Sequence, residues 1–247
     1  MFKPRNVLKL GVLCAALVLG HAETAAAHEV TDVLGRKVEV KDHVKRVVLG
    51  EGRLISAFAL LDKDAPFQRI VGWQNDLKLL DQNTYNAYVA KFPTVKDIPL
   101  IGQASEQSVS AEEILSLKPD LAVFSISGHG PTEHSAVADV LAKAGIPVLF
   151  VDFRINPVQG THTSMNALGQ ALGREAQAKA FLGFYDQHIK AITDAVATLP
   201  AGPRPSVFLE LLAGAWQAPG HTTGKSGMGE EIKPVSYTHL RAHETKA

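Results

Sequence analysis

Cysteine is almost missing from the 247-residue chain: Cys14 is the only one. Because it lies inside an N-terminal apolar run that we expect to be removed, the mature protein would use neither disulfides nor a catalytic thiolate. An excess of charge is missing too, since 25 basic and 25 acidic residues balance and the basic ones are scattered along the chain. A nucleic-acid partner is therefore not expected.

The apolar run at the N-terminus, Leu10–Gly20, is too short to cross a bilayer as part of a mature protein. Basic residues precede it and the small residues Ala25–Ala27 follow it, which is the pattern of an export signal. Leu13 stands before Cys14, where a lipoprotein signal needs a small residue, so we expect no lipid anchor. The sequence thus predicts a signal peptide that is cleaved near Ala27 and a soluble protein in the periplasm.

Short apolar strands alternate with helical segments over the next part of the chain. Val30–Val40 alternates around a Leu-Gly-Arg turn and predicts a hairpin. Five further apolar segments are typical of buried strands, and they lie in Arg46–Gly52, Arg69–Trp73, Pro99–Gly102, Leu121–Phe124 and Ile146–Phe153. Helical patterns, such as Arg53–Leu61, separate several of them. This order predicts a parallel sheet that is covered on both faces by helices.

A long helix follows this region. Gly173 interrupts the helical segment that starts near Thr163, and from Arg174 to Leu199 apolar residues recur at helical spacing. About 25 residues at 1.5 Å each make a helix of roughly 37 Å, which could connect two lobes as a rigid strut. The prolines and glycine of Leu199–Pro205 then end the helix, and Ser206–Leu212 is expected to begin a new strand.

Six segments of this chain occur in a familiar order: TDVLGRKVEV, RVVLGEG, SVSAEEILSLKPDLAVF, GIPVLFVDF, LGREAQA and RPSVFLE. From Thr31 to Ile232 the chain resembles the substrate-binding proteins of ABC importers for ferric siderophores and cobalamin. The resemblance implies an α/β fold with two Rossmann-like lobes, mainly parallel sheets, and one long connecting helix. It also implies a monomer without enzymatic activity or cofactor, which captures a ferric siderophore and delivers it to an inner-membrane ABC permease.

The expected organisation follows from the segments and the resemblance. We expect a signal peptide over 1–27, an N-terminal α/β lobe over 28–160, a helical region over 161–199, and the start of an incomplete C-terminal lobe over 200–233. Residues 234–247 change abruptly in pattern. Their string VSYTHLRAHET matches one reading frame of the adapter used in shotgun sequencing libraries, so we interpret the tail as an artefact that joins a fragment near Lys233. The His239 and His243 pair in it would then be no metal site, although its spacing suits one.

Ligand contacts are expected in the loops that leave the carboxyl ends of parallel strands. An iron chelate is often anionic and partly apolar, so arginines and aromatic rings suit it. Glu51, Gln74 and Phe153 also lie in these loops. The candidate ligand residues are Arg53, Trp73, Gln103, His129, Arg154, Trp216 and His221.

A second site is implied by the resemblance alone. Ser108 or Ser110 can cap a short helix with Glu112 and Glu113 in its first turn, where acidic residues are favourable in any helix. In the family, a glutamate of this motif docks onto arginines of the permease, and here it matches Glu112.

The residues support other functions less well, although some alternatives stay open. Cobalamin and haem remain open, because the same fold carries corrinoids and several iron chelates. A zinc or manganese carrier would need several ligands around one ion, and only His129 and His221 could meet across a cleft. Pro219–Gly227 departs from a phosphate-binding loop, which needs four residues between its first glycine and Gly-Lys. An exported hydrolase is disfavoured, since no Gly-x-Ser-x-Gly elbow is present.

Overall fold

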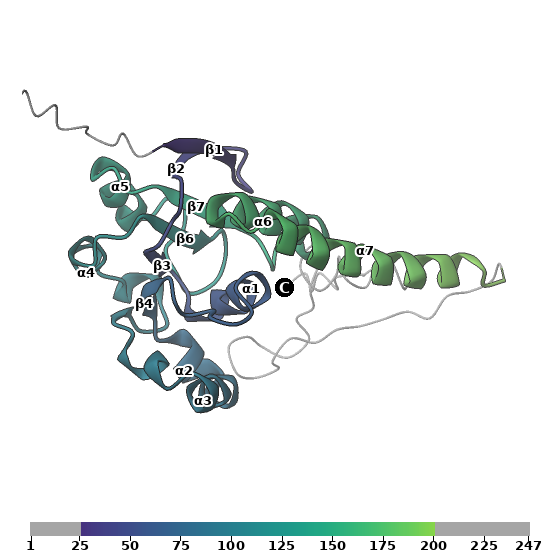
Figure 1. Cartoon of the computed structure of the whole chain (residues 1–247), viewed down its shortest axis with the longest axis horizontal. Helices are drawn as coiled ribbons and strands as arrows, with labels where there is room; N and C mark the ends of the chain where they lie inside the picture. The colour runs from purple at the N-terminus through teal and green to yellow at the C-terminus, as the bar shows by residue number, and fades with distance from the viewer. Residues whose placement is uncertain (1–25, 201–247) are drawn as a thin grey trace, which may run out of the picture.

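A five-stranded parallel sheet organises the part of the chain that the computed structural model describes, residues 26–200 (Figure 1). The spatial order is β5-β4-β3-β6-β7, and every neighbouring pair is parallel. The strands are β3 (Val47–Leu49), β4 (Ile70–Gln74), β5 (Leu100–Gly102), β6 (Leu121–Ser125) and β7 (Val148–Val151). The predicted parallel sheet is therefore confirmed. Trp216, His221, the strand expected at Ser206–Leu212, the tail and all but the end of the signal peptide lie outside the described residues.

The two faces of the sheet bury different side chains in two separate clusters. In β3, Val47 and Leu49 belong to one cluster while Val48 belongs to the other. The same alternation runs through β6 and β7, and it places the rings of Phe124 and Phe150 together on the second face, 6.0 Å apart. Since successive side chains of a strand point to opposite faces, both faces need a helical cover.

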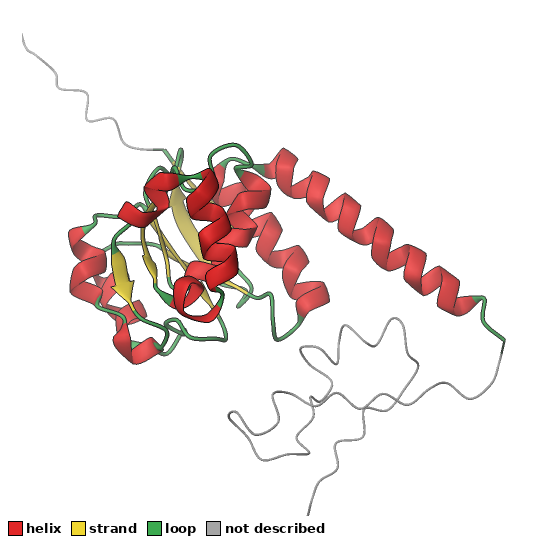
Figure 2. Cartoon of the chain, turned by 90° about the horizontal axis from the view of Figure 1, so that it is seen from below, coloured by secondary structure: helices red, strands yellow, loops and turns green. Residues whose placement is uncertain are grey.

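Helices supply this cover on both sides (Figure 2). The first cluster contains side chains of α1 (Ile55–Leu61), α6 (Pro157–Leu172) and α7 (Glu175–Ala197). The second cluster contains Ile114 and Leu141, which come from the helices α4 (Ala111–Ser116) and α5 (Ala136–Lys143) respectively. The sheet is thus the middle layer of a three-layer α/β arrangement, as predicted.

Two helices between β4 and β5 were not predicted from the sequence. The polar stretch after β4 forms α2 (Asp76–Leu80) and α3 (Gln82–Lys91), and the Asp81 carboxylate caps α3 by accepting a hydrogen bond from the Thr84 N–H. Three short 3₁₀ helices complete the described part of the chain: η1 (Gly52–Leu54), η2 (Pro93–Asp97) and η3 (Glu106–Ser108). In η1 the chain turns from β3 into α1.

The predicted hairpin is confirmed and stands apart from the main sheet. Strands β1 (Ala27–Thr31) and β2 (Lys37–Lys41) pair antiparallel around a turn in which Gly35 adopts a φ of 74°. The buried Asp32 carboxylate accepts hydrogen bonds from the Leu34 and Arg36 N–H groups and from the Arg36 guanidinium. This turn is therefore held by an internal ion pair.

The long helix α7 begins next to the predicted residue and spans 23 residues, or about 34 Å at 1.5 Å each. Gly173 separates it from α6 with a left-handed φ of 63°. Only Ala178 and Leu182 of α7 are buried, because the helix packs on α6 and α1 with its first half and then projects from the lobe (Figures 1 and 2). None of the described helices is both long and apolar enough to span a membrane.

Candidate functional site

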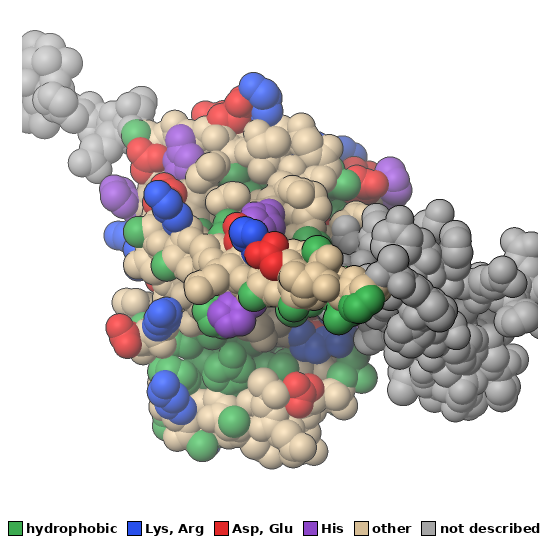
Figure 3. Space-filling view, turned by 90° about the vertical axis from the view of Figure 1, so that its right-hand side faces the viewer, with side chains coloured by type: hydrophobic (Ala, Val, Ile, Leu, Met, Phe, Trp, Pro, Cys, Tyr) green, Lys and Arg blue, Asp and Glu red, His purple; other side chains and the backbone are tan. Residues whose placement is uncertain are grey.

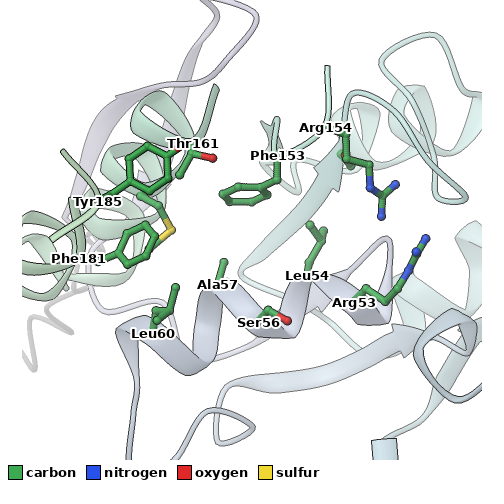
Figure 4. A pocket seen from close by; sticks show the side chains of 12 residues that line it. Arg53, Leu54, Ser56, Ala57, Leu60, Phe153, Arg154, Thr161, Phe181 and Tyr185 are labelled. Carbon is green, nitrogen blue, oxygen red and sulfur yellow. The ribbon is translucent and has the colours of Figure 1, made fainter. Parts of the chain in front are cut away.

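A cavity of about 360 Å³ opens at the carboxyl ends of the parallel strands. The chain runs from β3 outward to β4 and β5 and then returns to the other side of β3 with β6, and such a reversal is where α/β sheets hold ligands. The walls of the cavity come from the loops after β3 and β7, from the end of β6, and from α1, α6 and α7 (Figure 4). The lining residues are Arg53, Leu54, Ser56, Ala57, Leu60, Ser125, Phe153, Arg154, Thr161, Met165, Phe181 and Tyr185.

Two arginines form one end of this cavity. Arg53 lies in η1 after β3, and Arg154 lies in the loop after β7. Figure 4 shows their guanidinium groups close together on the same side of the cavity. Their side chains are 32% and 35% exposed, so both remain accessible to a ligand.

Glu51 holds Arg154 from behind. Its carboxylate is completely buried and accepts two hydrogen bonds from the Arg154 guanidinium, at 3.2 Å from Nη1 to Oε1 and 2.6 Å from Nη2 to Oε2. It also accepts the backbone N–H groups of His129 and Gly130, at 2.5 and 3.2 Å. A paired fork of this kind fixes the plane of the guanidinium as well as its position.

Asp76 holds Arg53 through a single bond to its guanidinium. Its carboxylate is also completely buried, and it accepts hydrogen bonds from Arg53 Nε at 2.9 Å and from the Gly52 N–H at 2.5 Å. Burial raises the pKa of the Asp76 carboxyl above its ordinary value, and this effect outweighs the opposing hydrogen bonds from Arg53 and Gly52. Both cavity-lining arginines are thus anchored on acids inside the wall.

Two glycines let the loop after β6 close over Glu51. Gly128 has a φ of 131°, and a Cβ added there would lie 1.8 Å from Glu51 Oε1 and 1.9 Å from Arg154 Nη1. A Cβ on Gly130 would lie 2.4 Å from the Gly50 carbonyl oxygen. The buried ion pair therefore depends on the absence of side chains at Gly128 and Gly130.

The loop after β7 is shaped by Asp152. Its buried carboxylate accepts hydrogen bonds from the N–H groups of Arg154, Ile155 and Asn156, while Ser164 Oγ accepts a hydrogen bond from the Asp152 N–H. These bonds order the loop before α6 begins. As a result, Phe153 and Arg154 project into the cavity from a fixed backbone (Figure 4).

The rest of the cavity is largely apolar. Phe153 faces the rings of Phe181 and Tyr185, which belong to the first half of α7 and lie 6.0 Å apart (Figure 4). On the outer surface, hydrophobic side chains gather in a hollow of the face toward which α7 projects (Figure 3). The site therefore combines a hydrogen-bonding end with an aromatic wall.

The remaining predicted site residues lie elsewhere. Trp73 is 2% exposed and packs edge-on against Phe67, with ring centroids 5.8 Å apart, so it belongs to the core beside β5 rather than to the cavity. Gln103 is exposed, and its side chain accepts a hydrogen bond from Asn75. The His129 side chain is exposed too, and only its backbone joins the Glu51 network. The structure thus brings together Arg53 and Arg154 of the predicted set.

Glu112 lies on α4, which does not line the cavity. Ser110, one of the two predicted caps, accepts a hydrogen bond from the Glu113 N–H and donates one to the Glu112 carboxylate. Glu112 itself is exposed. Within residues 26–200, no three His, Cys, Asp or Glu side chains are grouped so that they could hold a metal ion.

Sequence reasoning missed the residues behind the arginines and one wall of the cavity. Asp76 was not predicted, and Glu51 was expected in a ligand loop but not among the candidate ligand residues. Thr161 and Met165 of α6 were also missed. An available signal was the position of Asp76, two residues after a strand end, where parallel strands present polar side chains to a ligand or to each other.

A family model described as "Periplasmic binding protein" matches residues 65–232. Among curated proteins, the chain is 30% identical over 154 residues to the molybdate-binding protein MolA of Haemophilus influenzae, covering 61% of this chain and 40% of MolA. It is 27% identical over 154 residues to the uncharacterised ABC transporter substrate-binding lipoprotein YvrC of Bacillus subtilis, covering 61% of this chain and 46% of YvrC. The chain thus spans less than half the length of these relatives.

Solved structures show the same fold. The TroA-like periplasmic binding protein FepB of Veillonella parvula superimposes with a TM-score of 0.63 at 26% identity, over 74% of this chain and 53% of that one. MolA of Haemophilus influenzae, bound to molybdate, superimposes with a TM-score of 0.56 at 20% identity, over 70% of this chain and 55% of that one. The described lobe therefore has the architecture of a TroA-like binding protein.

Proposed function

The chain belongs to the periplasmic binding protein family, and from this premise we propose that it is the solute-binding component of an ABC importer. It is exported by its N-terminal signal, captures a solute outside the inner membrane and delivers it to the permease. One observation carries the proposal. Two anchored arginines and an aromatic wall converge on a cavity at the carboxyl ends of a parallel sheet, where this architecture binds ligands.

The ligand that fits this cavity best is a ferric siderophore complex. Such a chelate carries oxygen acceptors around the metal on a partly apolar frame. The acceptors suit the guanidinium groups of Arg53 and Arg154, while the frame suits Phe153 and Tyr185. Haem and cobalamin have the same combination of an apolar body and polar groups, and they are the alternatives of the same fold.

Molybdate is a second candidate, and the 30% identity to the molybdate-binding protein MolA favours it. The two ligands place different demands on the site. Molybdate is a small tetrahedral dianion that requires several donors around one point, whereas a chelate fills the whole cavity and contacts the aromatic wall. The size of the cavity, about 360 Å³, supports the larger ligand.

Delivery would use a separate surface of the lobe. We place permease docking on Glu112, which is exposed on α4 and outside the cavity. In this arrangement α7 connects the N-terminal lobe of residues 28–160 to a second lobe. Ligand binding and docking then occupy separate surfaces, so the loaded protein can present its cavity and its docking helix together.

Calorimetric titration of the full 247-residue chain tests the proposal. Ferric trihydroxamate, ferric tricatecholate, haemin, cobalamin and molybdate are added separately, and calorimetry is preferred because Trp73 is buried away from the cavity. We expect a ferric chelate to bind and Arg154→Gln to weaken it by about tenfold or more. Lys190→Gln is the control, since Lys190 pairs with Asp194 on the outer part of α7. Saturation by molybdate with no response to any chelate would overturn the siderophore assignment.

A further inference from the structure

The charged groups at the polar end of the cavity form one alternating array of acid and base. Asp76 contacts Arg53 Nε at 2.9 Å, Arg53 Nη2 lies 3.9 Å from Glu51 Oε2, and Glu51 Oε2 accepts Arg154 Nη2 at 2.6 Å. The four residues come from three separate strand ends, after β3, β4 and β7. The array is therefore a product of the fold and not of one loop.

The array has no net charge when its members are ionised. Two guanidinium groups face two carboxylates, and both carboxylates are completely buried behind the arginines. A ligand in the cavity meets the positive groups, but their field is largely cancelled by acids only 2.6–3.9 Å away. Proximity of arginines to the ligand thus does not make this an electropositive site.

Directed N–H donors remain available after this cancellation. The Nε of Arg53 donates to Asp76, and among residues 26–200 neither of its Nη atoms donates a hydrogen bond. The Nη1 of Arg154 donates to Glu51 and to the Ser127 carbonyl oxygen, and one N–H of its Nη2 donates to Glu51. The free N–H groups can bind acceptor oxygens at fixed angles.

We propose that Glu51 and Asp76 determine the ligand class of this cavity: they hold the two arginines as hydrogen-bond donors, cancel their charge, and so select chelates of low net charge over small multivalent oxyanions. The inference rests on the proposed solute-binding function and goes further by assigning the discrimination to two buried acids. A dianion would lose its hydration without gaining a net opposite charge, which is unfavourable. A chelate spreads its charge over many atoms and gains the aromatic wall.

The isosteric variants Glu51→Gln and Asp76→Asn test this assignment in the full chain. Each removes one negative charge beside the arginines but keeps an oxygen that can accept the neighbouring backbone N–H groups. Asp32→Asn is the matched control, since Asp32 is equally buried and pairs with Arg36 at 2.7 Å, in the β1–β2 turn. Circular dichroism verifies that each variant is folded, and a fold loss in one of the two leaves the other as the test.

The readout is the affinity for molybdate and sulfate, measured by calorimetry beside a neutral ferric trihydroxamate. We expect Glu51→Gln and Asp76→Asn to bind the dianions at least about tenfold more tightly than the unmodified chain, with an effect that salt weakens. Asp32→Asn should bind them like the unmodified chain. Unchanged dianion affinity in the folded cavity variants, or an equal gain in the control, would overturn the inference.

The two proposals fail in different ways. If the unmodified chain binds no chelate but the cavity variants gain dianion affinity, the proposed function falls and the charge cancellation stands. If the chain binds a chelate and the variants gain nothing, the function stands and the assignment to Glu51 and Asp76 falls.

Discussion

Gly128 tests whether the buried ion pair depends on a residue without a side chain at this position. In Gly128→Ala the new Cβ would lie 1.8 Å from Glu51 Oε1 and 1.9 Å from Arg154 Nη1, on a residue whose φ is 131°. The unfavourable φ alone costs about 1–3 kcal/mol. Separating a completely buried carboxylate from its partner adds to this, discounted because Arg154 is partly exposed. We expect a total loss of about 3–5 kcal/mol in the free energy of unfolding.

Gly145→Ala is the matched control for this substitution. Gly145 also has a positive φ, 72°, but an added Cβ there would meet no atom within 4 Å. Only the backbone strain remains, so the expected loss is about 1 kcal/mol. Urea unfolding followed by circular dichroism gives both values. Hydrogen exchange reports the same event locally, because the His129 and Gly130 amides donate to Glu51 and should lose protection in Gly128→Ala alone. Equal losses in both variants, with protected loop amides, would refute the reasoning.

Two further predictions concern single buried side chains. Because burial raises the pKa of Asp76, the folded state binds more protons than the unfolded state above the ordinary value of 3.8, so this residue's contribution to stability falls as the pH rises. The stability difference between the unmodified chain and Asp76→Asn should therefore shrink from acid to neutral pH in urea titrations, and a constant difference would contradict it. Phe58→Ala removes a fully buried ring of α1 and should cost about 3–5 kcal/mol by the same assay. Leu60→Ala, on the exposed side of α1, should stay within about 1 kcal/mol, and equal losses would contradict the assignment of the core face.

The layered fold could be predicted from the sequence because its signals are local. Apolar strands such as Val47–Leu49 end in glycine and polar residues, and Gly173 marks the helix end with the left-handed conformation that only glycine adopts easily. Helices α2 and α3 could not be predicted in this way. The α3 sequence, Gln82–Lys91, buries no residue completely and is mostly polar, so it lacks the apolar stripe by which a helix is recognised.

The site could be predicted only as far as strand ends indicate it. Arg53 and Arg154 follow strands and were expected at the ligand, and the structure brings them to one cavity although 101 positions separate them. Trp73 also follows this rule, yet it points into the core. Successive side chains at a strand end point in opposite directions. A residue's place after a strand therefore does not determine whether its side chain faces the cavity or the interior.

The role of the acids behind the arginines could not be predicted, because the sequence does not show in which direction an acidic side chain points. Glu51 lies two residues before the cavity-lining Arg53, and Asp76 lies at the neighbouring strand end, so either side chain could have pointed into the cavity. Both carboxylates are completely buried and paired with the arginines in front of them. A guanidinium that is paired in this way presents N–H donors at fixed angles, while its positive charge is cancelled by the acid. We therefore expect recognition in this cavity to depend on the angles of a few N–H groups and on the aromatic wall, with little contribution from long-range attraction of anions.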